Sequence, residues 1–119
     1  MEVVKMELQG MHNTIREAEY LVRQAQERAM AGDHVSAEHY LKKAIDKYPR
    51  YAEAYTLLGN CQDCQGKPED AIASYDKALQ IDPGHAEAWF NKGMSLKKLG
   101  KAKEATSCVE KSIDLYCGR

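Results

Sequence analysis

The stretch AEAYTLLGNCQDCQGKPEDAIASYDKALQIDPGH, residues 52–85, decides the fold of this chain. Its first half has small and apolar residues at helical spacing and reaches a break at Gly66. Pro68 then suits the first turn of a second helix, because proline's missing N–H costs nothing there. Apolar residues recur every three or four positions in the second half, until Pro83 and Gly84 end the pattern. The stretch predicts two short helices joined by a tight turn.

The same unit is present three times, at 18–51, 52–85 and 86–119. Residues of one kind recur at an offset of 34: Gly32/Gly66/Gly100, Ala37/Ala71/Ala105, Ala18/Ala52/Ala86, Glu19/Glu53/Glu87 and Lys43/Lys77/Lys111. A period of this length predicts stacked helix pairs, each packing on its neighbours, rather than a closed globule. Within a pair, Gly59 and Ala71 leave room for close approach, and Tyr55 and Tyr75 fill the space between pairs.

The composition excludes some classes of function. The chain has 17 Lys and Arg against 18 Asp and Glu, a formal net charge of -1, whereas nucleic-acid binding needs clustered positive charge. The sequence has no apolar run long enough to span a membrane, and residues 1–10 lack the apolar core of a signal peptide. We therefore expect a cytoplasmic protein whose four cysteines stay reduced.

Residues of the middle unit resemble the tetratricopeptide repeat (TPR) family. They carry the aromatic, leucine, small and proline positions of that family's pattern: Tyr55, Leu58, Gly59, Ala71, Tyr75, Ala78 and Pro83. The third unit departs from the pattern at Lys92, Ser112 and Cys117, and the first unit matches it least. The resemblance implies an all-α superhelix, a solenoid of three antiparallel helix pairs, preceded by an N-terminal extension at 1–17.

That extension is expected to be partly mobile. Gly10 should interrupt any helix there, and from about His12 the chain should extend the first helix of the repeats backwards.

The resemblance also implies a binding surface. In this family the first helix of each pair lines a concave groove, which implies partner-binding residues at Arg23, Gln26, Thr56, Leu57, Asn60, Phe90, Asn91, Met94, Lys97 and Lys98. Such a mixed surface suits an extended peptide or a partner helix. The amides of Asn60 and Asn91 would hold a peptide backbone, and Lys97 and Lys98 would favour an acidic partner. Each of these positions also has a structural explanation that needs no partner. The lysines are favourable at a solvated helix C-terminus, and the asparagines are common in the family whatever it binds. Phe90 and Met94 could be half-buried packing residues.

Some members of the family grip the C-terminal carboxylate of heat-shock chaperones with a clamp of basic and amide side chains. The clamp positions here hold Val22, Gln26, Leu57, Glu87 and Asn91. None of these is basic, and a glutamate would repel a carboxylate. The sequence therefore argues against chaperone-tail binding.

Cys61 and Cys64 form a C-x-x-C, so a weaker alternative is a metal or redox protein. The favoured explanation is that Cys61 is a small buried residue of the helix. The sequence has no phosphate loop, G-x-S-x-G or H-E-x-x-H motif, so we predict neither an enzyme nor a cofactor.

A structural alternative involves the last helix. Its outer face would present Val109, Ile113 and Tyr116, an apolar stripe with no following helix in the sequence to cover it. The sequence therefore allows self-association into a homodimer, docking of a neighbour's N-terminal segment, or a place inside a longer protein.

Overall fold

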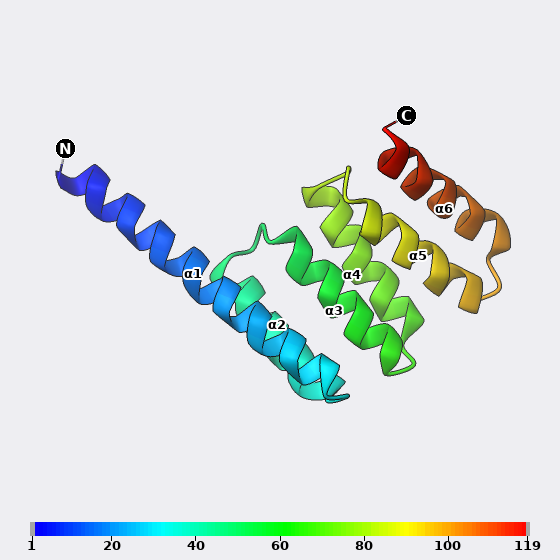
Figure 1. The fold of residues 1–119 in the computed structure, drawn as a ribbon, viewed down its shortest axis with the longest axis horizontal. Helices are drawn as coiled ribbons and strands as arrows, with labels where there is room; N and C mark the ends of the chain where they lie inside the picture. The colour runs from blue at the N-terminus through cyan, green and yellow to red at the C-terminus, as the bar shows by residue number, and fades with distance from the viewer. Residues whose placement is uncertain (1, 119) are drawn as a thin grey trace.

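The computed structural model describes residues 2–118, and side chains from residue 5 onward. The described residues form six helices: α1 (Glu2–Met30), α2 (His34–Lys47), α3 (Ala52–Cys64), α4 (Pro68–Ile81), α5 (Ala86–Lys98) and α6 (Ala102–Cys117). They pair as three hairpins stacked side by side, with the N-terminal part of α1 projecting beyond the stack (Figure 1). The molecule measures 55 × 35 × 20 Å. The prediction of an all-α superhelix of helix pairs is confirmed.

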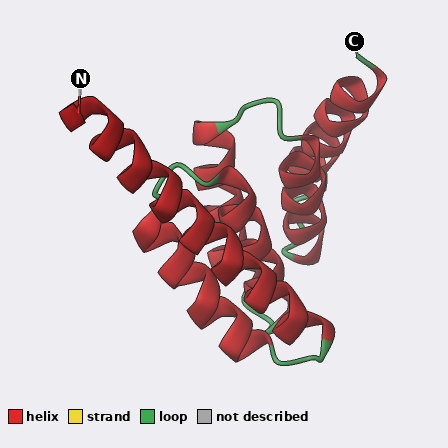
Figure 2. Cartoon of the chain, turned by 60° about the vertical axis from the view of Figure 1, so that its left-hand side comes forward, coloured by secondary structure: helices red, strands yellow, loops and turns green. Residues whose placement is uncertain are grey.

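The recurring glycines explain the tight turns inside each hairpin. Gly32, Gly66 and Gly100 have φ of +83°, +77° and +77°, a left-handed conformation that residues with a Cβ adopt at a cost. After α3, the Gly66 N–H bonds the Asp63 carbonyl and the Lys67 N–H bonds the Gln62 carbonyl, each at 3.0 Å. These two bonds close the helix end and send the chain back antiparallel. Figure 2 shows the short loops that result.

Close approach of the two helices in a pair depends on a small residue facing a larger one. A Cβ placed on Gly59 of α3 would lie 2.5 Å from the Cε1 of Tyr75 on α4. One repeat later, a Cβ on Gly93 would lie 2.8 Å from the Cγ2 of Val109. The glycine positions therefore set the spacing of both hairpins.

The first helix differs from the sequence-based expectation. α1 runs without a break from Glu2 to Met30, so the prediction that Gly10 interrupts the helix is wrong. One glycine inside a helix costs only about 1 kcal/mol relative to alanine, which good helix formers on either side offset. The Thr14 hydroxyl also donates to the Gly10 carbonyl at 2.9 Å. Among the described residues no helix is both long and apolar enough to cross a membrane.

Candidate functional site

The first helices of the three pairs form the inner layer of the stack. α3 contacts both α1 and α5, whereas among the described residues the second helices, α2, α4 and α6, do not contact one another. The first helices of neighbouring repeats therefore lie closer together than the second helices do. The stack therefore curves with α1, α3 and α5 on its concave side.

Several residues predicted for this face are accessible there. Phe90 on α5 is 42% exposed, a high value for a phenylalanine, and Lys97 is exposed about two turns later. Leu57 is partly buried and packs against the first core cluster, so it combines core packing with a place at the groove. Arg23 and Gln26 are exposed on α1, and Met94 is partly buried on α5.

The structure corrects the prediction for Thr56. Its side chain is 1% exposed and so does not line the groove. The Thr56 hydroxyl donates to the Ala52 carbonyl at 3.2 Å and lies 3.0 Å from the Nδ1 of His85, in the loop before α5. Thr56 thus ties the second repeat to the start of the third.

The two asparagines predicted for the groove form one hydrogen-bonded network. The Asn60 Oδ1 accepts from the Tyr75 hydroxyl at 2.7 Å and from the Asn91 Nδ2 at 2.9 Å. Burial, with the nearby Asp63 carboxylate adding to it, raises the pKa of Tyr75, so the phenol stays a donor at neutral pH. The network fixes Asn60 and Asn91 side by side on α3 and α5. It leaves the Asn60 Nδ2 and the Asn91 Oδ1 as the amide atoms outside these bonds.

A second link between α3 and α5 uses charge. Asp63 pairs with Lys98 and accepts from the Ser95 hydroxyl at 3.2 Å. The sequence placed Lys98 in the groove as a cation for an acidic partner, but its charge is largely matched inside the protein.

We predict that Lys98→Met changes the free energy of unfolding by less than about 1 kcal/mol, because one partner of this ion pair is exposed to solvent. Urea denaturation of both proteins at low salt measures this change in the free energy of unfolding. A loss of several kcal/mol would show instead that the partly buried carboxylate of Asp63 depends on Lys98.

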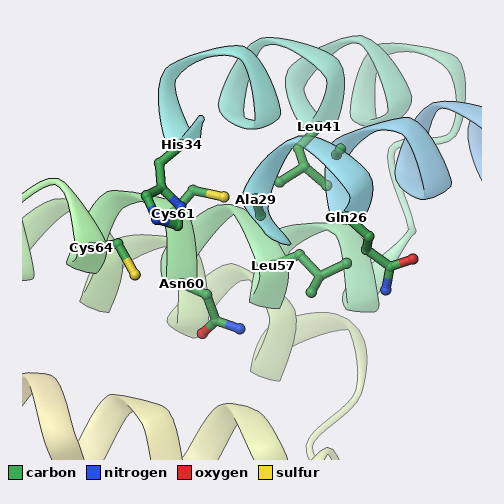
Figure 3. Close-up of a pocket in the computed structure, with 9 residues that line it drawn as sticks. Gln26, Ala29, His34, Leu41, Leu57, Asn60, Cys61 and Cys64 are labelled. Carbon is green, nitrogen blue, oxygen red and sulfur yellow. The ribbon is translucent and has the colours of Figure 1, made fainter. Parts of the chain in front are cut away.

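Between α1 and α3 the groove deepens into a pocket of about 120 Å³ (Figure 3). Its lining residues come from α1, α2 and α3: Ala25, Gln26, Ala29, His34, Leu41, Leu57, Asn60, Cys61 and Cys64. The Nδ1 of His34 is buried and has no hydrogen-bond partner. The sequence interpretation treated His34 as one of several scattered histidines and missed its place here. No spacing rule links His34 to the α3 residues of the pocket, Leu57 to Cys64, which follow it along the chain.

The four cysteines are free thiols of two kinds. Cys61 and Cys108 are buried, whereas Cys64 and Cys117 are exposed. Burial raises the pKa of Cys61 to about 11, with Cys64 and Glu38 adding to the shift. Among the side chains that the structure describes, from residue 5 to residue 118, no group of three or more His, Cys, Asp or Glu is arranged to hold a metal ion. Among the same residues, Cys61 and Cys64 are therefore not joined by a third candidate ligand.

Iodoacetamide at pH 8 is expected to modify Cys64 and Cys117 quickly and Cys61 slowly, since the thiolate is the reactive form and Cys61 is both buried and protonated. Peptide mass spectrometry over a time course measures the order. Rapid modification of Cys61 in folded protein would contradict the burial of this helix face.

The fold defines a helical-repeat protein whose concave face is formed by α1, α3 and α5, and sequence comparison supports the assignment. The tetratricopeptide repeat model matches residues 52–85, and a second model of the same repeat matches residues 74–106. The chain belongs to the tetratricopeptide repeat family. The resemblance predicted from its residues is therefore confirmed, and this family consists generally of non-catalytic interaction modules.

Relatives in sequence differ greatly in length. The chain is 33% identical over 77 residues to the protein MJ0572 of Methanocaldococcus jannaschii, covering 65% of this chain and 72% of that protein. It is 26% identical over 83 residues to anaphase-promoting complex subunit 3 of Schizosaccharomyces pombe, covering 70% of this chain but 12% of that protein. For the second of these relatives the match is a small part of a larger protein.

Two solved structures show the same fold. MamA superposes with a TM-score of 0.80 at 27% identity, over 86% of this chain and 60% of that one. The second TPR domain of Spaghetti (RPAP3), solved with the HSP90 peptide SRMEEVD, superposes with a TM-score of 0.86 over 90% of this chain and 98% of that one. At 19% identity the second likeness concerns the fold alone.

Proposed function

We propose that the concave face of α1, α3 and α5 binds an extended peptide segment of another protein, without catalysis and in the cytoplasm. The observation that carries the proposal is the exposure of Phe90 beside the Asn60–Asn91 pair, one helix away from an open pocket. An exposed aromatic ring is a common anchor of protein interfaces. The Asn60 Nδ2 and the Asn91 Oδ1 supply one donor and one acceptor, the pair that a peptide backbone needs.

The electrostatics of the face favour a partner with few charges. Lys98 is paired with Asp63, which leaves Lys97 as the groove lysine that would meet an acidic residue of the partner. A single exposed lysine contributes modestly to affinity. We therefore propose that an acidic residue in the partner adds to binding and does not dominate it.

The Spaghetti domain binds a chaperone peptide on a similar fold, which supports a peptide as the type of ligand for this groove. The same peptide is not the ligand that we propose. Val22 is buried in the core and Gln26 and Leu57 are uncharged, so the first two repeats offer no basic group at the clamp positions.

The test is a selection of peptides from a random 12-residue phage library on the immobilised protein, followed by calorimetry on a synthetic peptide. Phe90→Ala is expected to weaken binding at least about tenfold, the effect of losing an interface anchor. Tyr20→Ala is the matched control, because Tyr20 is also an exposed aromatic residue, 54% against 42% for Phe90, and lies on α1 outside the groove residues. Equal losses for both variants, or no loss for Phe90→Ala, would contradict binding in the groove.

A second candidate function is self-association through the outer face of α6. Ile113 is 46% exposed, whereas Leu79, its counterpart one repeat earlier, is 8% exposed and packs in a cluster with Ala88 of α5. Tyr116, 70% exposed, also lies on this side of α6. Val109, which the sequence placed in the same stripe, instead is partly buried, with its Cγ2 against Gly93 of α5. Sedimentation of the protein and of Tyr116→Glu tests this candidate: a dimer that the substitution dissociates supports it, and a monomer at high micromolar concentration excludes it.

A further inference from the structure

We propose that copies of this protein associate head to tail, with the outer face of α1 in one copy packed on the open face of α5 and α6 in another. This inference rests on the second candidate function, and it names the surface that α6 meets. Each chain already contains two contacts of this kind, because α3 packs on the first hairpin and α5 on the second. The 34-residue period therefore specifies which residues of two copies would meet.

The face of α5 and α6 is open at positions where the second hairpin is covered. Among the described residues α6 contacts α5 alone, whereas α4 contacts both α3 and α5. Leu79 of α4 is buried beneath α5, but Ile113, one period later, is exposed. Thr56 of α3 is likewise buried, and Phe90, one period later, is exposed. The exposed apolar residues therefore mark the place that a following first helix would take.

The outer face of α1 is a first helix without a hairpin to pack on. Tyr20 corresponds to Ala54 of α3 and Ala88 of α5, both of which are fully buried against the preceding hairpin. Tyr20 itself is 54% exposed, because none of the described hairpins covers it. Since Ala88 packs with Leu79, the same contact between two copies brings Tyr20 to Ile113. Tyr20 also borders an open depression, which is further lined by Arg16, Glu17, Leu21 and Lys47.

The two ends differ in side-chain size from the internal contacts, and the differences compensate. Tyr20 is larger than the alanines at its position. On the other end Val109 stands where the second hairpin has Tyr75, and with Met94 and Thr106 it lines an open depression between α5 and α6. A large ring from the second copy therefore meets a face whose own side chain is small.

Tyr116 of α6 also has a counterpart at the other end. Between the first two repeats, the rings of Tyr48 and Tyr51 lie 5.7 Å apart. The same contact between two copies joins Tyr116, which is 70% exposed, to Glu17 of the second copy. Glu17 lines the depression beside Tyr20, so the Tyr116 ring has an open place to occupy.

Charged side chains at the two ends are complementary. Within the chain, the Ser95 hydroxyl of α5 donates to the Asp63 carboxylate of α3 at 3.2 Å. The corresponding residues of two copies are Glu27 of α1 and Lys97 of α5, which are both exposed and have opposite charges. An ion pair thus replaces the internal hydrogen bond, and these charges favour a second copy as the occupant of this face.

The contact has a consequence for the groove, because it covers Phe90. The Thr56 hydroxyl lies 3.0 Å from the Nδ1 of His85, and the corresponding residues of two copies are Phe90 and Glu17. Phe90 is also the anchor proposed for a bound peptide. A second copy and a peptide therefore compete for Phe90, and self-association limits peptide binding.

Sedimentation velocity of two single variants and of their mixture tests the head-to-tail contact. Tyr20→Glu places a charge on the α1 end and Ile113→Glu on the α6 end, both at exposed positions, and circular dichroism checks that each variant keeps its helices. The parent protein is expected to form species larger than a dimer at high micromolar concentration, because a head-to-tail dimer has two free ends. Each variant alone is expected to be monomeric. Their equimolar mixture allows one intact contact and is expected to stop at a dimer.

Three results of this experiment would overturn the proposal. A parent protein that stays monomeric at high micromolar concentration would exclude the contact. A Tyr20→Glu protein that associates like the parent would show that the α6 faces pair with each other. A mixture that stays monomeric, like its two components, would show that the α1 and α6 ends do not meet.

Charge reversal tests the pairing that the period specifies. Glu27→Lys and Lys97→Glu are each expected to weaken association about threefold, as the loss of an exposed ion pair implies. A chain with both substitutions is expected to associate like the parent, because opposite charges meet again. Glu7→Lys, in the part of α1 that projects beyond the stack, is the matched control and should change nothing (Figure 1). A double variant weaker than either single variant would overturn the proposed pairing.

A peptide selected on the groove separates this inference from the proposed peptide binding. The monomeric Tyr20→Glu protein is expected to bind the peptide at least as tightly as the parent does, because no second copy covers Phe90. Peptide binding to a parent protein that sediments as a monomer would leave the groove standing and overturn the head-to-tail contact. Association of the parent without any selected peptide would support the contact and count against the groove.

Discussion

Replacing Gly59 by leucine is expected to lower the free energy of unfolding by about 3 kcal/mol, the upper end of the usual range for overpacking. A Cβ at this position already lies 2.5 Å from Cε1 and 2.8 Å from Cδ1 and Cζ of Tyr75. The Tyr75 ring is 1% exposed and its hydroxyl is bonded to Asn60, so it has no free space into which to move. The hairpin of α3 and α4 must therefore open. Urea denaturation followed by circular dichroism measures the loss.

Gly10→Ala is the matched control for this prediction. Gly10 is also a helical glycine, but a Cβ there has nothing within 4 Å. The added methyl group is expected to raise the free energy of unfolding by about 0.5–1 kcal/mol through helix propensity alone. If Gly59→Leu left the free energy of unfolding unchanged, the close approach of α3 and α4 would not be a requirement of the fold.

Tyr75→Ala is expected to have the largest effect of any single substitution described here, a loss of about 3–5 kcal/mol. Tyr75 has the largest side chain among the fully buried residues of the described chain. Its removal leaves a cavity opposite Gly59, which has no side chain to fill it, and takes a donor away from Asn60. The same denaturation experiment measures the loss.

Tyr75→Phe divides this effect into its parts. Phenylalanine keeps the ring and loses the hydrogen bond to Asn60, so the expected loss is about 1 kcal/mol. It should also loosen Asn60 and weaken peptide binding more than it weakens the fold. A loss as large as that of Tyr75→Ala would mean that the polar network, rather than ring packing, holds this hairpin together.

The repeat architecture was predictable because its causes are local and recur. The left-handed glycines at the turns and the small residues that face larger ones recur at a fixed offset in the sequence. The prediction that Gly10 interrupts α1 failed because the outcome there is not decided by one residue. The penalty of one glycine is small, and whether Gly10 breaks a helix depends on the sum over its neighbours rather than on the residue itself.

The site was predictable only in outline. The family pattern located α3 and α5 on the concave face, but not which side chains reach the surface: Thr56 turns inward to His85, while Phe90 stays exposed. The ion pair of Asp63 and Lys98 could have been predicted from the sequence. The two residues are 35 positions apart, and residues about one repeat apart lie beside each other on neighbouring first helices. The pocket has no such signal, since it forms where three helices from two repeats meet around His34.

The most direct test of the groove is a nuclear magnetic resonance titration of the ¹⁵N-labelled protein with the peptide selected on it. Binding in the groove predicts shifts of backbone amides in α1, α3 and α5, including those of Gln26, Asn60 and Phe90, with the outer face of α6 unchanged. Shifts confined to residues around Ile113 and Tyr116, or shifts on the second helices of the pairs, would contradict the proposal that the concave face is the binding surface.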